Sequence, residues 1–402
     1  MNAPGADADL DRRPLSGLRV LDLSRLLPGP LATLVLSDLG AHVDKVEDPA
    51  GGDYLRVMPP RLGDPSVAEP MNAAFHLLNR GKRSAVLDLK RPEGRDALLR
   101  LIPRYDVVIE SFRPGVMERL GLGPDRLMAL HPRLVYCAIT GYGQTGPAAH
   151  RAGHDLNFLA RAGVLALGGP PEGPPQIPGV QMADVAGGGL FAVAGILSAL
   201  VARGVTGRGR IVDVSMCEGS MMLGAFGLMG ALAGHPELNG TGALSGGIAP
   251  FGTYRTRDGR AVALAALEPK FWSAFAAEVG LPADMEALLP GPHQTGWKAR
   301  LEALFASRDL DAWVALSERV DCCLEPVLEP GELIHDRQHQ ARGMFVSQRA
   351  SGLRVPMPRT PIARGVAEGE APSQGRDTRA VLEDAGFSSE EIAALVACGA
   401  AR

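Results

Sequence analysis

Short apolar runs alternate with helical patterns along the first 140 residues, and this alternation constrains the fold more than any other feature. Leu18 to Leu23 and His42 to Val46 are typical of strands, and Pro28-Gly29-Pro30 begins a helical pattern that continues to Leu39. Strands that alternate with helices indicate βαβ units and a parallel sheet. Further strands are predicted at Ser84 to Leu89, Val107 to Ser111 and Leu134 to Thr140, and further helices at Pro92 to Ile102 and Asp125 to Leu130. The sequence therefore predicts an α/β fold with a Rossmann-like parallel sheet.

Two segments follow directly after predicted strands. Ser24 to Pro30 follows the first strand, and Ser111 to Arg119 follows a later one. Ligands of parallel sheets lie beyond the carboxyl ends of the strands, so we expect both segments at a binding site. Gly141 to Gly146 has the glycine spacing of a dinucleotide fingerprint, but it follows a late strand and leads into Pro147. This context does not favour an NAD site.

A second region of different character begins near Cys217. It opens with a methionine-rich helical pattern, and methionines at helical spacing are more often core than ligand lining. A hairpin is predicted from Gly252 to Leu264 with its turn at Asp258-Gly259. Ser388 and Glu391 form a capping box that predicts a last helix, Glu390 to Ala397. The predicted domains are a large domain at 1–216, a smaller α+β domain at 217–334, and a return to the large domain at 335–402.

Two side chains have the chemistry of an acid/base pair. His154 follows Gly153, and its unperturbed pKa lies nearest to neutral pH, so it can take or give a proton there. Asp184 precedes a run of three glycines, which lets backbone or ligand approach its carboxylate. Taken singly, each also fits a plain structural reading, in which Asp155 caps a helix from Leu156 to Gly163 and Asp184 caps another.

Composition limits the classes of partner. A chain of 402 residues with 46% hydrophobic content can bury a large core and is expected to hold two domains. The net charge of −4 argues against nucleic acid. The apolar run Leu190 to Val201 is too short for a membrane helix, and residues 1–13 resemble a polar tail more than a signal peptide. Five cysteines without metal-ligand spacing predict no metal site and fit a reducing cytoplasm.

Several longer segments occur in an order that is typical of one family. They are residues 15–47, 79–94, 111–123, 141–147 and 206–219. In these segments the chain resembles the class III coenzyme A transferase (CaiB/BaiF) superfamily, which also contains the 2-methylacyl-CoA racemases. The resemblance covers nearly the whole chain. It implies a large and a small domain, an interlocked homodimer, and no cofactor beyond coenzyme A carried as the substrate thioester.

The resemblance also gives roles to individual residues. Asp184 matches the aspartate that is the nucleophile of the transferases and a base in the racemases. Gly153-His154-Asp155 matches the Gly-His-Asp of the racemases, in which the histidine is the second base. Glu268, in the phrase Ala266 to Phe271, matches a racemase glutamate beside that histidine, and in an interlocked dimer it would complete the site of the other subunit. The short Gly246-Gly247 run, where transferases have a longer one, also favours the racemases.

Three functions remain open. The favoured one is an acyl-CoA epimerase acting on a 2-methyl-branched thioester, in which His154 and Asp184 exchange a proton at the α-carbon. The resulting enolate needs donors at the thioester oxygen, for which the N–H of Asp155 is the best candidate. The alternative is a CoA-transferase with Asp184 as nucleophile. The third, a CoA-binding protein without chemistry, is disfavoured by the intact His154, Asp184 and Glu268.

A binder of polyanionic coenzyme A must gather cations locally, although charged side chains are usually solvated surface. Two clusters of cations are candidates: Arg80, Lys82 and Arg83 form one, and Arg113 with Arg119 forms the other. The resemblance places Arg119 on the pyrophosphate and Arg25, Leu26 and Pro28 at the adenine and ribose. Ser111-Phe112 stands where many members have Asn-Phe, and Asp48 replaces a basic residue. The full set of expected CoA contacts is Arg25, Leu26, Pro28, Arg80, Lys82, Arg83, Ser111, Phe112, Arg113 and Arg119.

Overall fold

The computed structural model describes residues 13–62, 71–363 and 365–402, so most of the expected N-terminal tail lies outside the described residues. The chain forms two compact units. Unit 1 contains the chain up to Phe158, Val180–Met222 and Arg337–Arg402, and unit 2 contains Leu159–Gly179 and Leu223–Asp336. Residues 159–179, which the sequence pattern assigned to the large domain, therefore cluster with the smaller unit.

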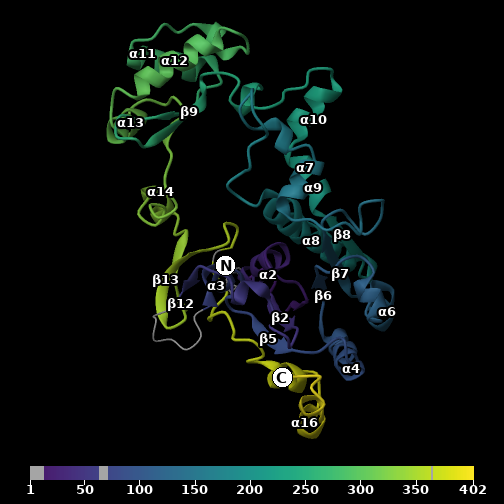
Figure 1. Cartoon of the computed structure of the whole chain (residues 1–402). Helices are drawn as coiled ribbons and strands as arrows, with labels where there is room; N and C mark the ends of the chain where they lie inside the picture. The colour runs from purple at the N-terminus through teal and green to yellow at the C-terminus, as the bar shows by residue number, and fades with distance from the viewer. Residues whose placement is uncertain (1–12, 63–70, 364) are drawn as a thin grey trace, which may run out of the picture. The chain divides into compact units, whose positions relative to one another are not determined.

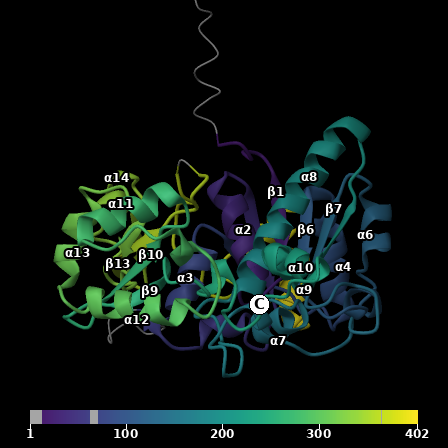
Figure 2. The same ribbon diagram turned by 90° about the horizontal axis from the view of Figure 1, so that it is seen from above.

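A six-stranded parallel sheet forms the centre of unit 1 (Figures 1 and 2). Its strand order is β5-β2-β1-β6-β7-β8. The predicted α/β fold with a parallel sheet is confirmed, and all five predicted strands are present. The periodicity does not predict the edge strand β8, which pairs with β7. The strand bounds are β1 Arg19–Asp22, β2 His42–Glu47, β5 Arg83–Val86, β6 Val107–Glu110, β7 Val135–Thr140 and β8 Ile211–Ser215.

Helices cover both faces of this sheet, because successive side chains of each strand point to opposite faces. Leu21 of β1 packs with Leu98, Leu127 and Leu382 in one buried cluster, so their helices lie on the same face. The next residue, Asp22, points the other way and accepts a hydrogen bond from Thr33. The helices of the first face are α4 Pro92–Leu101, α6 Pro124–Leu130, α15 Thr378–Asp384 and α16 Ser389–Ala397, and the other face carries α2 Pro28–Asp38 and α8 Phe191–Thr206.

One long helix runs from Ala183 to Thr206. Its first part, Ala183–Leu190 (η4), is a π-helix, and it continues directly into α8. The 24 residues are long and apolar enough to cross a membrane by length and composition, so the expectation that no segment reaches that length is corrected. The reason is that η4 extends the apolar run beyond Leu190. The helix packs against β7, β8 and α2, and 39% of its apolar window is buried.

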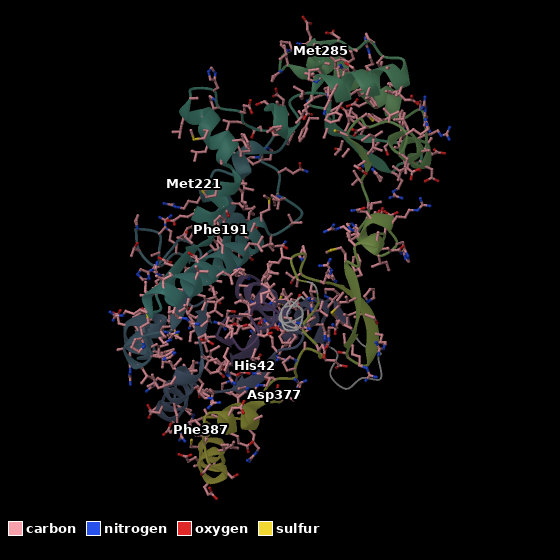
Figure 3. All side chains as sticks on the ribbon, turned by 180° about the vertical axis from the view of Figure 1, so that it is seen from behind. His42, Phe191, Met221, Met285, Asp377 and Phe387 are labelled. Carbon is pink, nitrogen blue, oxygen red and sulfur yellow. The ribbon has the colours of Figure 1, made fainter. Side chains whose placement is uncertain are left out.

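The C-terminal segment joins unit 1 at strand β5. The carboxylate of Asp377, labelled in Figure 3, accepts the N–H of Ser84 at 2.9 Å, and Leu87 pairs with Ala401. The predicted capping box is present, with Ser388 and Glu391 each bonding the other's backbone N–H, and the last helix is confirmed. The remaining elements of this unit are η1 Tyr54–Arg56, β3 Arg61–Leu62, β4 Met71–Asn72, α3 Ala73–Asn79, η2 Ile102–Arg104, α5 Val116–Arg119, α9 Met216–Leu223, α14 Arg337–Ala341, β12 Phe345–Ala350 and β13 Leu353–Pro358.

Unit 2 is an α+β body with a three-stranded antiparallel sheet. The predicted hairpin is confirmed as β9 and β10, and Gly259 has a φ of 80° at its turn, where a side chain would be strained. An aromatic core lies under the helices, and Phe305 stacks on both Tyr254 and Phe275. The bounds are β9 Phe251–Arg255, β10 Ala261–Ala265, β11 Leu324–Pro326, α10 Ala225–Leu232, α11 Pro269–Val279, α12 Gln294–Phe305 and α13 Leu310–Ser317, and α7 Asp155–Arg161 crosses from unit 1 into unit 2.

Candidate active site

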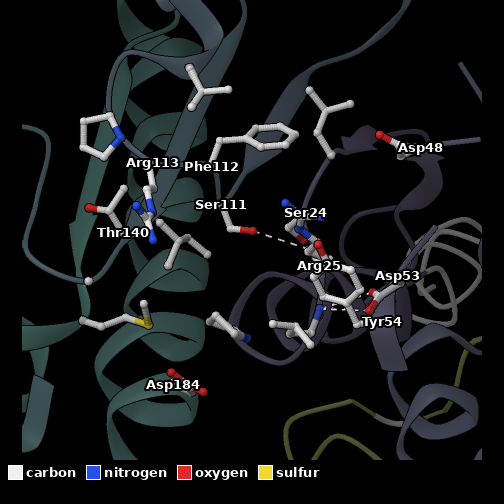
Figure 4. Close-up of a pocket in the computed structure, with 18 of the residues that line it drawn as sticks. Ser24, Arg25, Asp48, Asp53, Tyr54, Ser111, Phe112, Arg113, Thr140 and Asp184 are labelled. Carbon is white, nitrogen blue, oxygen red and sulfur yellow. Dashed lines mark hydrogen bonds between the residues drawn. The ribbon is translucent and has the colours of Figure 1, made fainter. Parts of the chain in front are cut away.

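A pocket of about 750 Å³ opens at the carboxyl ends of the parallel strands, and all of its lining residues belong to unit 1. Ser24 follows β1, Ser111 follows β6, and Thr140 ends β7. Side chains from several segments therefore meet at one edge, because parallel strands all end on the same side of the sheet. Figure 4 shows this pocket with Asp184 and the loops after β1 and β6.

The two segments predicted at the binding edge both line the pocket. They contribute Arg25, Leu26 and Pro28 from the first loop, and Ser111, Phe112 and Arg113 from the second. The guanidinium carbon of Arg25 lies 4.8 Å from the ring centre of Tyr54 and 5.9 Å from that of Phe112. A cation between two aromatic faces is attracted to both rings. This end of the pocket thus presents a guanidinium group supported by two aromatic rings.

Four of the expected cations lie outside the pocket lining. Arg80 and Lys82 are fully buried, paired with Asp38 and with Asp22 respectively, and neither lines the pocket. Arg83 is paired with Asp44 and Asp384. Since a buried charge needs a partner inside the protein, these side chains are already committed to carboxylates. Arg119 is exposed and lies beside Gly115, outside the pocket lining.

The pocket contains residues that the sequence reading did not single out. Lys90 and Arg151 line it as exposed cations, and Tyr54 supports Arg25. Lys90 lies 3.4 Å from Asp48, the position at which a basic residue was expected from the family pattern. Glu110 is buried at the end of β6 behind the pocket lining, and it accepts the N–H of the lining residue Phe112 at 2.7 Å. Only Arg151 carried a usable signal, since it lies three residues before His154.

His154 and Asp184 line the same pocket. His154 immediately precedes α7, and its carbonyl accepts the N–H of Asn157, so it occupies the N-cap position of this helix. The sequence pattern predicted that Asp155 caps the helix that follows it, but its carboxylate does not cap that helix. Its carboxylate instead accepts the N–H groups of Ala183 at 2.7 Å and Asp184 at 3.0 Å. Asp155 therefore ties the His154 segment to the start of the helix that carries Asp184.

The pKa of Asp184 is raised from 3.8 to about 6. Burial is the largest cause, because it disfavours the charged carboxylate, and the negative charge of Asp155 adds to it. The charge of His154 opposes both effects. A carboxyl group with this pKa can change protonation state near neutral pH, which is what a general acid or base requires.

The glycines after Asp184 allow close packing of its helix. A Cβ at Gly187 would lie 2.6 Å from the carbonyl oxygen of Met216, and one at Gly188 would lie 2.8 Å from the Met216 side chain. The sequence pattern predicted that these glycines admit backbone or ligand near the carboxylate. In the structure, the backbone and side chain of Met216 approach the helix at Gly187 and Gly188. π-Helical turns of this kind are frequent at functional sites.

Glu268 lies in unit 2, at the residue preceding α11. Its side chain is exposed and accepts no N–H from the first turn of that helix. The carboxylate is thus free to act on a group outside its own helix. Among the described residues, no cluster of three or more His, Cys, Asp or Glu side chains is arranged to hold a metal ion.

The sequence is similar to known proteins along nearly its whole length. The model of CoA-transferase family III matches residues 15–378. Alpha-methylacyl-CoA racemase from Homo sapiens is 37% identical over 94% of this chain and 95% of its own length. Succinate--glutarate CoA-transferase from Agrobacterium fabrum is 34% identical over 87% of this chain and 89% of its own length. A crystal structure of a CAIB/BAIF family protein from Brucella suis superimposes with a TM-score of 0.81 at 33% identity, over 93% of this chain and 100% of that one. The chain therefore belongs to CoA-transferase family III.

Proposed function

We propose that this protein is an acyl-CoA epimerase that interconverts the (R) and (S) forms of a 2-methyl-branched acyl-CoA thioester. The observation that carries the proposal is that the imidazole of His154 lines the same pocket as the carboxyl group of Asp184, whose pKa is raised to about 6. The similarity to alpha-methylacyl-CoA racemase along nearly the whole chain supports the same reading. Inversion at the α-carbon needs a base on one face and an acid on the other, and no redox chemistry.

In the proposed reaction, ionised Asp184 removes the α-proton of one enantiomer, and protonated His154 delivers a proton to the opposite face. For the other enantiomer the two residues exchange roles. Between the steps, negative charge collects on the thioester oxygen. The N–H of Asp155 lies in the first turn of α7, where backbone N–H groups have no acceptor within the helix, and it is the proposed donor to that oxygen.

The remaining parts of the site follow from the same proposal. The cations of the pocket, Arg25, Arg113, Lys90 and Arg151, would bind the phosphates and nucleotide of coenzyme A. Glu268 would stabilise the charged form of His154, since a nearby carboxylate favours the imidazolium. In an interlocked homodimer this glutamate would come from the second copy, a role that its exposed and uncommitted side chain permits.

A CoA-transferase is the second candidate, because one residue could serve both reactions. Asp184 is half-buried in the pocket and could attack a thioester carbonyl as readily as it could take an α-proton. Two transferase relatives match this chain at 34% identity over 85–87% of its length, and a third matches at 39% over 64% of it, compared with 37% over 94% for the racemase from Homo sapiens. The Gly-His-Asp sequence at 153–155 and Glu268 favour the epimerase.

The test uses the purified protein with one enantiomer of 2-methyl-branched acyl-CoA in deuterated water, without a second acid. We expect deuterium at the α-carbon and loss of optical purity, followed by NMR. If the α-proton stays, and CoA moves to a free carboxylic acid that is added in a second assay, the protein is a transferase. Hydroxylamine gives an independent readout, because it should inactivate a transferase during turnover by capturing an aspartyl thioester and should leave an epimerase active.

A further inference from the structure

The turn after β1 has an unusual backbone. Leu26 has a φ of 65°, one of four positive φ values among the described residues other than glycine. This left-handed conformation is strained for a residue with a side chain, so contacts in the structure must maintain it. The turn comprises Ser24, Arg25 and Leu26, and it carries the cation that lies between Tyr54 and Phe112.

Two buried, oppositely charged side chains hold the turn on either side of Arg25. The carboxylate of Asp53 accepts the N–H of Leu26 with both oxygens, at 3.1 and 3.2 Å. The ammonium of Lys45 donates to the carbonyl of Ser24 at 2.6 Å. The two side chains are themselves an ion pair at 3.1 Å, and both are almost completely inaccessible to solvent. Figure 4 shows the bonds between Asp53 and the turn.

Strand β2 fixes the position of the Lys45–Asp53 ion pair. Lys45 lies in β2, and its pKa is raised, since burial would lower it but the charges of Asp22, Asp53 and Glu47 outweigh that effect. Asp53 donates its own N–H to Glu47, the last residue of β2. Because the strand is a rigid element, the positions of the Ser24 carbonyl and the Leu26 N–H are fixed before any ligand arrives.

We propose that the Lys45–Asp53 ion pair is a positioning clamp that presets the Ser24–Leu26 turn and thereby holds Arg25 ready for the nucleotide half of a coenzyme A ligand. This inference rests on the proposed function only in taking coenzyme A as the ligand. Lys45 and Asp53 act through main-chain atoms on the two sides of Arg25 and through no reacting group. Preorganisation of this kind strengthens binding by removing the cost of ordering the turn.

The test is a double-mutant cycle read by calorimetric titration of free coenzyme A. Asp53→Asn and Arg25→Ala should each raise the Kd by about tenfold. The Kd of the double variant should be little higher than that of either single variant. Coupling of this kind is expected when one residue acts through the other. Multiplication of the two effects would overturn the proposal, as would an unchanged Kd for Asp53→Asn.

Asp44→Asn is the matched control. Asp44 is equally buried in β2 and equally paired with cations, but it contacts neither the turn nor the pocket. The clamp predicts lower thermal stability for Asp44→Asn with an unchanged Kd for coenzyme A. Equal losses of affinity in Asp44→Asn and Asp53→Asn would show a general effect of stability, which contradicts the clamp.

A second pair of variants keeps the test decisive if Asp53→Asn does not fold. Leu26→Pro removes the N–H and fixes φ near −65°, whereas Leu26→Gly retains the N–H and reaches positive φ readily. We expect Leu26→Pro to bind coenzyme A at least fivefold more weakly than Leu26→Gly, and equal affinities would refute the clamp. Wild-type protein that binds coenzyme A but does not exchange an α-proton would refute the proposed epimerase and leave the clamp standing.

Discussion

Asp22 and Asp184 are both acidic side chains withdrawn from solvent in unit 1, yet their surroundings push their pKa values in opposite directions. Burial alone would raise the pKa of Asp22, but Lys45 and Lys82 outweigh it and hold the value at about 2. Asp184 has burial and the charge of Asp155 acting on it together, and its pKa rises to about 6. A buried carboxylate with a cation partner supports structure, and one without such a partner is available for chemistry.

Removing the charge of Asp22 should produce the largest effect on stability. Asp22→Asn leaves Lys82 and Lys45 buried with one fewer counterion, and breaking a buried pair typically costs 3–5 kcal/mol. Chemical denaturation at pH 7 measures this loss. In the wild type, the contribution of Asp22 is present above its unfolded pKa of about 4 and is lost as the pH falls toward 2. An Asp22→Asn variant as stable as wild type would contradict the structural role of Asp22.

His154→Ala should produce the largest effect on the reaction alone. Loss of one acid/base group lowers epimerisation by at least about 10², since such groups typically contribute 10² to 10⁴. Coenzyme A affinity and melting temperature should stay nearly unchanged, because His154 is exposed and begins a short helix. A fall in stability that accounts for the whole loss of rate would return His154 to a structural role.

Asp184→Asn should lower activity and raise stability, the reverse of a structural carboxylate. The folded pKa lies above the unfolded value, so the stability contributed by protonated Asp184 is complete below pH about 4 and is lost as the pH rises through about 6. An uncharged asparagine avoids this loss, and we expect a gain on the order of 1 kcal/mol at pH 8 and little change at pH 4. Thermal unfolding at the two pH values measures the difference, and a loss of stability at pH 8 would contradict the raised pKa.

Asp155→Asn should give the smallest of these effects, a shift in the pH dependence of the rate. The amide oxygen can still accept the N–H groups of Ala183 and Asp184, but the negative charge is gone. The pKa of Asp184 should therefore fall, and the acidic limb of the rate should move to lower pH by up to about one unit, in the direction in which Asp184 is the base. Asp155→Ala is the matched variant, because it also removes the hydrogen bonds and should lower the rate itself. An unshifted limb in Asp155→Asn would exclude Asp155 as a source of the raised pKa.

Local patterns in the sequence predicted most of the sheet and its helices. The capping box at Ser388 and the hairpin turn at Asp258-Gly259 depend on residues adjacent in sequence, and both are present. The strand β8 was missed because its residues alternate weakly and it pairs with a partner about 75 residues earlier, near Tyr136. Periodicity carries no information about such distant pairing.

The site residues also divide into those that local sequence patterns predict and those that depend on contacts distant in sequence. The loops after β1 and β6 could be placed at the pocket because strand order determines where they lie. Arg80 and Lys82 look like surface cations in the sequence, and only the fold reveals Asp38 and Asp22 beside them. The sequence pattern predicted Asp155 as a cap for the adjacent helix, whereas the N–H groups that donate to its carboxylate lie 28 and 29 residues later.

The central claim is that His154 and Asp184 act on opposite faces of one carbon, and a single measurement tests it directly. His154→Ala is incubated in deuterated water with each pure enantiomer of a 2-methyl-branched acyl-CoA, and NMR follows deuterium entry and optical purity. The account predicts that the enantiomer facing Asp184 exchanges its α-proton with retention of configuration, while the other enantiomer does not exchange and neither is inverted. Equal exchange of both enantiomers, or inversion at the wild-type rate, would contradict it.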